Sequence, residues 1–118
     1  MASLLVHLAT GPEHSTRAAL AFLVAKTAAE EGHDVQVFLA GDAVQLARRE
    51  TAEAVQGTGT GNVAEHWDAL TAAGVPIFLS GMSSKARGID VGGLEGVEAA
   101  PPQKLVELAT QADTTLTY

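Results

Sequence analysis

The chain has 118 residues, a formal net charge of −7 and no cysteine, and 47% of its residues are hydrophobic. This length suits one globular domain, so we expect residues 1–118 to form a single α/β unit. The acidic balance argues against nucleic acid and against an anionic membrane surface, because both need clustered Lys and Arg. Without cysteine, disulfides, thiolate metal sites and thiol or persulfide chemistry are excluded.

The first half of the chain alternates strand and helix signals. Residues 3–9 form a short apolar run that ends at a Thr-Gly-Pro turn, which predicts a buried strand. Residues 13–31 have the length and composition of a helix closed by a glycine. Residues 34–40 predict a second strand. An Asp-x-x-Gln capping pattern at Asp42 then predicts a helix over 43–49.

The helix predicted over 13–31 is apolar on nearly all sides. Its apolar residues are Ala18, Ala21, Phe22, Ala25, Ala28 and Ala29 on one face, and Leu20, Leu23 and Val24 on the opposite face. A helix of this kind must be covered on more than one side. Because the chain is short, we expect the second cover to come from another subunit.

The second half of the chain begins with a Gly-Thr-Gly-Thr-Gly stretch at 57–61, which predicts a flexible connection, either a linker or a mobile flap. It lacks the Lys-Ser/Thr ending of a phosphate-binding P-loop. An Asn-x-x-Glu capping pattern opens a helix over 62–73. Residues 75–79 predict a third strand, 80–88 a turn with one helical turn, and 101–112 a helix that begins at two prolines.

Two further short strands are predicted, one within residues 92–100 and one over 114–118. Strands that alternate with helices imply βαβ units with right-handed crossovers. We therefore predict an α/β fold built on an open, mostly parallel sheet of five strands. Trp67 is interpreted as either a core residue or an interface anchor.

Ligands of open parallel sheets bind beyond the carboxyl ends of the strands. The segments that follow the first three strands are 10–15, 41–42 and 80–88. The candidate ligand-binding residues are Ser80, Gly81, Ser83, Ser84, Lys85 and Arg87 in the third segment, with Thr10 and His14 in the first. Hydroxyls, two cations and the free N–H groups of a helical turn favour a small oxyanion or carboxylate.

A structural interpretation of the same residues stays open. Ser83 or Ser84 could cap the turn while Arg87 pairs with a neighbouring carboxylate. Thr10 with Glu13 also fits a capping box, in which both side chains satisfy helix N–H groups.

The segment Leu79–Ile89 is Leu-Ser-Gly-Met-Ser-Ser-Lys-Ala-Arg-Gly-Ile. It resembles a loop of the DsrE/YchN-like sulfur-relay family, in which this stretch tends to be Cys-Gly-x-Cys-x-x-Ala-Arg-Gly-Ile/Leu. Gly81 and the Ala-Arg-Gly-Ile end match, whereas Ser80 and Ser83 stand where cysteines are expected. The Thr-Gly-Pro turn, the Ala-rich helix and the terminal strand agree in outline over the whole chain.

The resemblance implies a three-layer fold with helices on both faces of the five-stranded sheet. It also implies a homo-oligomer, a trimer or a hexamer, or assembly with a paralogous subunit. Persulfide transfer is not carried over, because a Ser hydroxyl is far less acidic than a thiol and forms no stable persulfide. We therefore predict an oligomeric, non-thiol DsrE-like protein that binds a small anionic ligand or regulates a partner.

Two alternatives remain. One is a structural subunit that partners a cysteine-bearing sulfur-relay paralogue. The other is a weak enzyme based on Ser and His, for which His14 is the only base on a suitable loop and no Gly-x-Ser-x-Gly elbow is present. We assign no catalytic residue.

The remaining features predict no cofactor and no membrane segment. The four histidines, His7, His14, His33 and His66, have no metal-binding spacing, so we predict no metal or other cofactor. We interpret His7 as a hydrogen-bonded core or interface residue. No apolar run approaches the ~20 residues that span a bilayer, and the N-terminus does not resemble a signal peptide. We expect a cytoplasmic location.

Overall fold

A computed structural model describes residues 1–118 and contains an open sheet of five strands, all of them parallel. The strands are β1 (Ser3–Leu8), β2 (Asp34–Leu39), β5 (Ile77–Ser80), β6 (Val97–Ala100) and β7 (Thr114–Thr117), in the order β6-β5-β2-β1-β7. Parallel strands covered on both faces have continuous apolar runs, as β1, β2 and β5 do. The predicted α/β class with a five-stranded parallel sheet is confirmed.

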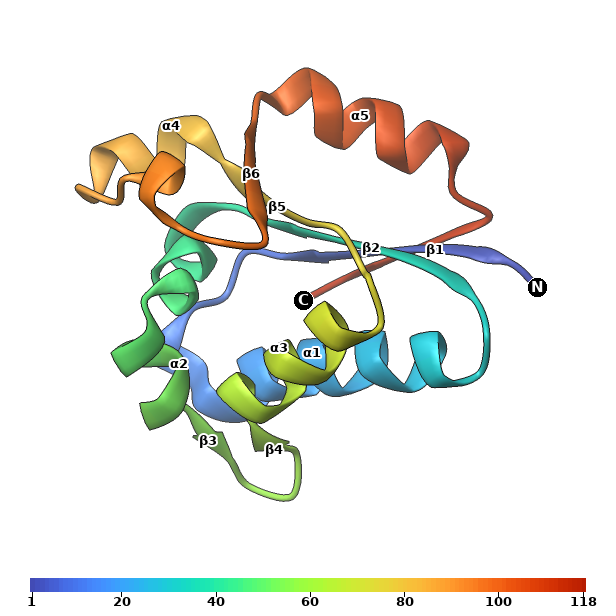
Figure 1. Cartoon of the computed structure of the whole chain (residues 1–118), viewed down its shortest axis with the longest axis horizontal. Helices are drawn as coiled ribbons and strands as arrows, with labels where there is room; N and C mark the ends of the chain where they lie inside the picture. The colour runs from blue at the N-terminus through green and yellow to red at the C-terminus, as the bar shows by residue number, and fades with distance from the viewer.

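The helices lie on both faces of this sheet (Figure 1). They are η1 (Pro12–His14), α1 (Ser15–Glu30), η2 (Gly41–Ala47), α2 (Arg49–Ala54), α3 (Val63–Ala72), α4 (Gly81–Ala86), η3 (Val91–Gly93) and α5 (Pro102–Gln111). In Figure 1, α1 and α3 lie on one side of the sheet and α5 on the other, which gives three layers. None of these helices combines the length and apolar character needed to cross a membrane.

The larger core lies between the sheet and the layer that contains α1 and α3. Alanines of α1 are buried there, and their small side chains let the helix approach the sheet closely. The ring of Phe22 stacks on Trp67 of α3, with centroids 5.2 Å apart and an angle of 21° between the planes. Trp67 therefore packs against the core of its own chain.

The smaller core lies under α5. Its buried residues are Leu5, Phe38, Phe78, Ala100 and Leu108. Lys104 of α5 lies over the ring of Phe78, 5.3 Å from its centroid, and so covers apolar surface with its stem. α5 thus covers this core (Figure 1).

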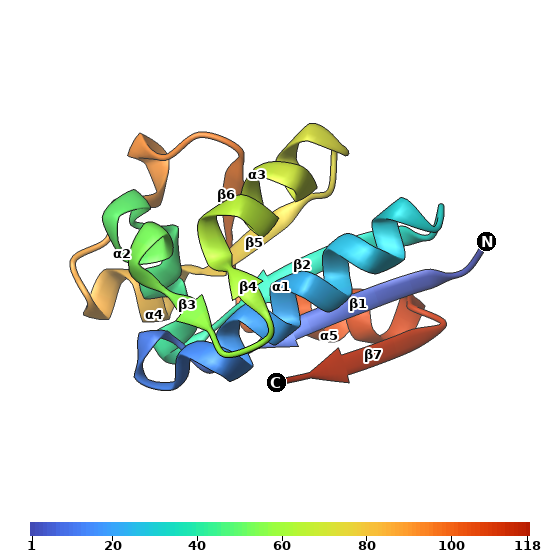
Figure 2. The same ribbon diagram turned by 90° about the horizontal axis from the view of Figure 1, so that it is seen from below.

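The connection predicted at 57–61 contains short strands that the sequence did not reveal. β3 (Gln56–Gly57) and β4 (Gly61–Asn62) form an antiparallel hairpin that packs beside α1 (Figure 2). The Thr58 N–H donates to the Thr16 hydroxyl, and the Thr60 hydroxyl donates to the Thr16 carbonyl, both at 3.1 Å. The hairpin is therefore held by contacts with a residue more than 40 positions away, which glycine content does not reveal.

The capping patterns had different outcomes. Asn62 caps α3 as predicted, since its Oδ1 accepts from the N–H groups of Ala64 (2.9 Å) and Glu65 (3.3 Å). The cap and helix predicted after Asp42 are wrong, because that segment forms the 3₁₀ helix η2 without a side-chain cap, and α2 follows. The predicted capping box of Thr10 is also wrong, since η1 has no side-chain cap.

Candidate functional site

The carboxyl ends of the strands meet at one edge of the sheet, which we call the carboxyl edge. η1 follows β1, η2 follows β2 and α4 follows β5. Because β2 lies between β1 and β5, η2 lies between η1 and α4. Gly11 approaches η2 so closely that a Cβ atom there would lie 2.2 Å from the carbonyl oxygen of Asp42. A glycine is therefore required where these two segments meet.

The two serines at the expected cysteine positions connect these segments. Ser80 ends β5, and its Oγ accepts from the N–H of Ser83 at 3.2 Å, which caps α4. Ser83 Oγ accepts from the N–H of Gly41 at 2.9 Å and joins α4 to η2. Each hydroxyl keeps its own proton as a donor. Neither is hydrogen-bonded to a histidine, so neither has the base that a serine nucleophile needs.

Arg87 contributes to the framework of the site. Its Nη2 and Nε donate to Asp42 Oδ1 at 3.0 and 3.3 Å, and its Nη1 donates to the Ser83 carbonyl at 3.1 Å. Arg48 Nη2 in turn donates to the Arg87 carbonyl at 2.8 Å. The alternative interpretation, in which Arg87 pairs with a neighbouring carboxylate, is thus confirmed, and that carboxylate is Asp42. The contribution of Arg48 was not predicted, because no local pattern links residues 39 positions apart.

The other predicted residues of the third segment differ in accessibility. Gly81 begins α4 and Lys85 is exposed on it. Ser84 is 1% exposed, and its Oγ has no hydrogen-bond partner. Ser84 thus lies inside the protein, whereas Lys85 is free to meet a ligand.

The first segment contacts η2 rather than α4. His14 is exposed, and its Nδ1 accepts from the N–H of Arg17 at 3.3 Å, so its ring caps α1. Thr10 is partly buried and makes no side-chain hydrogen bond, while Glu13 Oε1 accepts from the N–H of Gly11 at 2.9 Å. The structure therefore places Thr10 and His14 at the same edge as Ser80 and Ser83, with η2 between the two groups.

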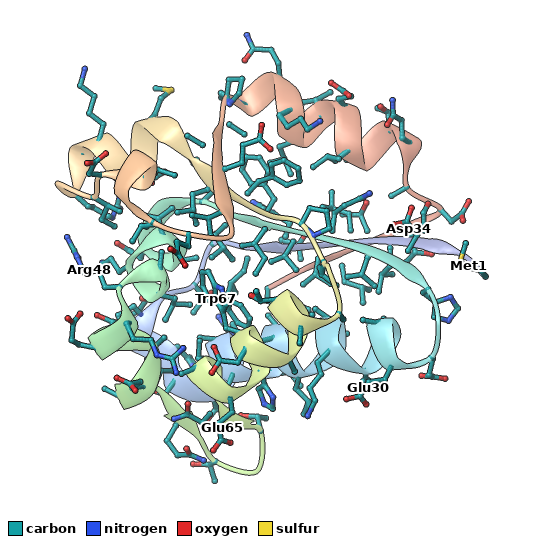
Figure 3. The ribbon with its side chains drawn as sticks, in the orientation of Figure 1. Met1, Glu30, Asp34, Arg48, Glu65 and Trp67 are labelled. Carbon is teal, nitrogen blue, oxygen red and sulfur yellow. The ribbon has the colours of Figure 1, made fainter.

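The unpaired cations of this acidic chain gather at the carboxyl edge. The paired Lys and Arg residues are Lys26 with Glu30, Arg49 with Glu53 and Asp68, Arg87 with Asp42, and Lys104 with Glu107. The three that form no ion pair are Arg17, Arg48 and Lys85, at the start of α1, after η2 and on α4. Figure 3 shows Arg48 at this end of the molecule, with Glu30 and Asp34 toward the other.

A groove lies beside Ser80 and was not predicted. Its volume is about 610 Å³, and its walls are Gly81 and Met82 of α4 and residues 99–103 around the start of α5. Met82 is 73% exposed. Met82, an apolar residue in the predicted turn, was the sequence signal that could have pointed to this surface.

His7 lies on β1 beside Phe38, with ring centroids 6.2 Å apart. Burial lowers the pKa of His7, because a buried imidazole is harder to protonate. Its Nε2 is buried without a hydrogen-bond partner, so the prediction of a hydrogen-bonded histidine fails for this atom. No group of three or more His, Asp or Glu side chains is placed to hold a metal ion.

A fully parallel five-stranded α/β sheet, with its polar loops collected at the carboxyl edge, defines the class of this protein. Within that class, the chain belongs to the DsrE/DsrF-like family, whose model matches residues 3–118. The chain contains no cysteine, and Ser80 and Ser83 stand where the resemblance leads us to expect cysteines.

Solved structures support the same assignment. The chain is similar to the ychN protein from E. coli, with 28% identity, a TM-score of 0.83 and 100% of both chains covered. It shares its fold with a protein of unknown function from Methanobacterium thermoautotrophicum, at 20% identity, a TM-score of 0.74 and full coverage of both chains. A further protein of unknown function, from Bacteroides thetaiotaomicron, is 15% identical with a TM-score of 0.72, over 98% of this chain and 94% of that one. Among curated proteins, none matches the chain.

Proposed function

We propose that this protein binds a small anion at the carboxyl edge of its sheet and transfers no sulfur. The observation that carries the proposal is the position of the unpaired cations. In a chain with a net charge of −7, Arg17, Arg48 and Lys85 have no carboxylate partner, and all three belong to segments at this edge. Cations that have no carboxylate partner attract anions to the surface around them.

The contacts proposed for the anion come mainly from α4. The hydroxyl protons of Ser80 and Ser83 remain free to donate, and Lys85 is exposed beside them. Arg87 supports the site indirectly, because its guanidinium holds Asp42 and the Ser83 carbonyl in place. Hydroxyl and ammonium donors suit an oxyanion or a carboxylate, and binding through them needs no covalent step.

Calorimetric titration with sulfate, phosphate, thiosulfate and acetate tests the anion site. We expect saturable binding of at least one of the four, weakening as NaCl is added because salt screens exposed charges. Lys85→Met should weaken binding roughly three- to tenfold. Lys26→Met is the matched control, since Lys26 pairs with Glu30 on α1, and it should bind as the parent does. The absence of saturable heat with every anion would remove the proposal.

Assembly as a homo-oligomer, a trimer or a hexamer, is part of the same proposal. The stripe formed by Leu20, Leu23 and Val24 on α1 is partly exposed, and none of the three packs against the core. Burying such a stripe between subunits stabilises an assembly by removing apolar surface from water.

Light scattering tests the assembly. We expect a trimer or hexamer for the parent chain and a smaller species for Leu23→Glu, because a carboxylate cannot be buried there without a partner. Val106→Glu makes the same change on α5, where Val106 is 61% exposed, and should leave the assembly intact. A parent chain that is monomeric, or a Val106→Glu variant that dissociates while Leu23→Glu does not, would contradict this interface.

The second candidate function is that of a subunit that assembles with a cysteine-bearing paralogue. The exposed Met82 and the groove beside it favour this alternative, because contiguous exposed apolar surface often marks protein contacts. The light-scattering result separates the two functions. A defined homo-oligomer supports the first, whereas a monomer that assembles only when the paralogue is added supports the second.

A further inference from the structure

A second cavity shares η2 with the proposed anion site and lies on the side of the sheet that holds α1 and α3. Its volume is about 550 Å³, within the range of roughly 300–1,000 Å³ typical of small-molecule sites. Its walls include Leu46, Ala47, Arg49, Trp67, Asp68 and the segment 94–97. They come from η2, α2, α3 and the segment that leads into β6.

The apolar part of this cavity is built around Trp67. The indole is supported by its stacking on Phe22, so it is held in one orientation. Leu46 is fully buried, and Leu94 and Val97 pack against the same core. A supported indole beside aliphatic walls suits a flat aromatic molecule, because aromatic rings stack in offset or edge-to-face arrangements.

The charges at the rim favour a cation. Arg49 donates to both carboxylate oxygens of Asp68, at 2.7 and 3.1 Å, and also lies 3.6 Å from Glu53. The hydrogen bond from Arg49 lowers the pKa of Asp68, so that carboxyl stays ionised. Glu95 is exposed and forms no ion pair, which leaves it as the uncompensated charge of the lining. The face of an indole also attracts cations.

We propose that this cavity binds a small aromatic molecule that carries a positive charge, with the ring against Trp67 and the cation toward Glu95. This cavity is proposed to bind a cation, whereas the site at the carboxyl edge is proposed to bind an anion. The two sites can therefore be tested independently, and the failure of one says nothing against the other.

Trp67 is the only tryptophan of the chain, so tryptophan emission comes from a residue that lines this cavity. Titration of the intact protein with benzylamine should give a saturable change in Trp67 emission, with a Kd of roughly 1 mM, typical of a fragment-sized ligand. Benzyl alcohol, which has the same shape without the charge, should bind more weakly. Benzoate should give no saturable change.

Two variants test the assigned contacts. Glu95→Gln should weaken benzylamine binding roughly two- to fivefold and leave benzyl alcohol binding unchanged, since an exposed ion pair contributes modestly. Glu107→Gln makes the same change on α5, on the other face of the sheet, and should have no effect. Ala47→Phe should fill the cavity and abolish binding of both ligands, with the thermal transition recorded to confirm folding.

Emission changes that rise linearly without saturation would overturn the proposal. An equal loss of benzylamine affinity in Glu95→Gln and Glu107→Gln would overturn the assignment of the cation to Glu95. Unchanged benzylamine binding in a folded Ala47→Phe variant would show that the ligand binds elsewhere, and the proposed cavity would then be wrong. If Ala47→Phe does not fold, the comparison of Glu95→Gln with Glu107→Gln still decides the proposal.

Discussion

Gly11→Ala is expected to lower the free energy of unfolding by about 1–3 kcal/mol, the usual cost of forcing an extra methyl group into a packed site. The added Cβ would lie 2.2 Å from the carbonyl oxygen of Asp42 and 2.7 Å from its carbonyl carbon. Both are backbone atoms, so no flexible side chain can move aside. The φ of Gly11 is −104°, outside the left-handed region that favours glycine, so the expected effect comes from the contact with Asp42. Urea unfolding followed by circular dichroism measures this change in the free energy of unfolding.

Gly81→Ala is the matched control, because Gly81 lies at the same edge and a Cβ there would meet only the Ala100 carbonyl oxygen, at 3.9 Å. Its stability should be unchanged or higher by about 0.4–1 kcal/mol, since alanine restricts the unfolded chain. Equal destabilisation of the two variants would contradict the contact between Gly11 and η2. The same contact predicts that Gly11→Ala weakens anion binding, because separating η1 from η2 moves Arg17 away from Arg48.

Local signals were sufficient to predict the main sheet. Apolar runs bounded by Gly, Pro and Asp identified β1, β2 and β5, and the two short strands predicted within 92–100 and over 114–118 correspond to β6 and β7. The alternation of strands with helices implied parallel pairing. The predicted strand over 3–9 and the observed β1, Ser3–Leu8, differ by one residue. This agreement has a physical cause, since burial of a short strand on both faces needs a continuous apolar run that the sequence displays directly.

The elements that failed depend on tertiary contacts. The Gly-Thr-Gly-Thr-Gly stretch forms a hairpin because Thr16 supplies two hydrogen bonds from α1. Asp42 has a good capping sequence but pairs with Arg87, 45 positions later, and the segment after it becomes a 3₁₀ helix. In both cases a distant partner competes with the local preference, and a single sequence does not show that partner.

The candidate site was predictable only in part, because some of its contacts also come from distant segments of the chain. The position of Ser80–Arg87 after a strand predicted that this segment lies at the carboxyl edge, and the resemblance supplied the two positions where cysteine is expected. The roles of Arg48 and of the Gly41 N–H were not predicted, since each depends on how η2 packs against α4. The sequence thus identified the donors on one segment, whereas the structure supplied those that neighbouring segments bring to it.

The central claim is that the carboxyl edge stabilises negative charge although serines stand where the resemblance leads us to expect cysteines. Ser83→Cys tests it, because the variant would hold the only thiol of the chain and its titration would report on this position alone. The Gly41 N–H donates to the Oγ of Ser83, and Lys85 and Arg87 lie on the same short segment. Donors and cations favour the thiolate over the thiol and so lower the pKa of a cysteine.

The measurement is the pH dependence of thiolate absorbance in Ser83→Cys, with Thr110→Cys on the exposed surface of α5 as the control. We expect the control to titrate near the ordinary thiol pKa of about 8.5, and Ser83→Cys to titrate at least about 1 unit lower. A pKa for Ser83→Cys equal to or above that of Thr110→Cys would show that this position does not stabilise an anion, and would contradict the claim.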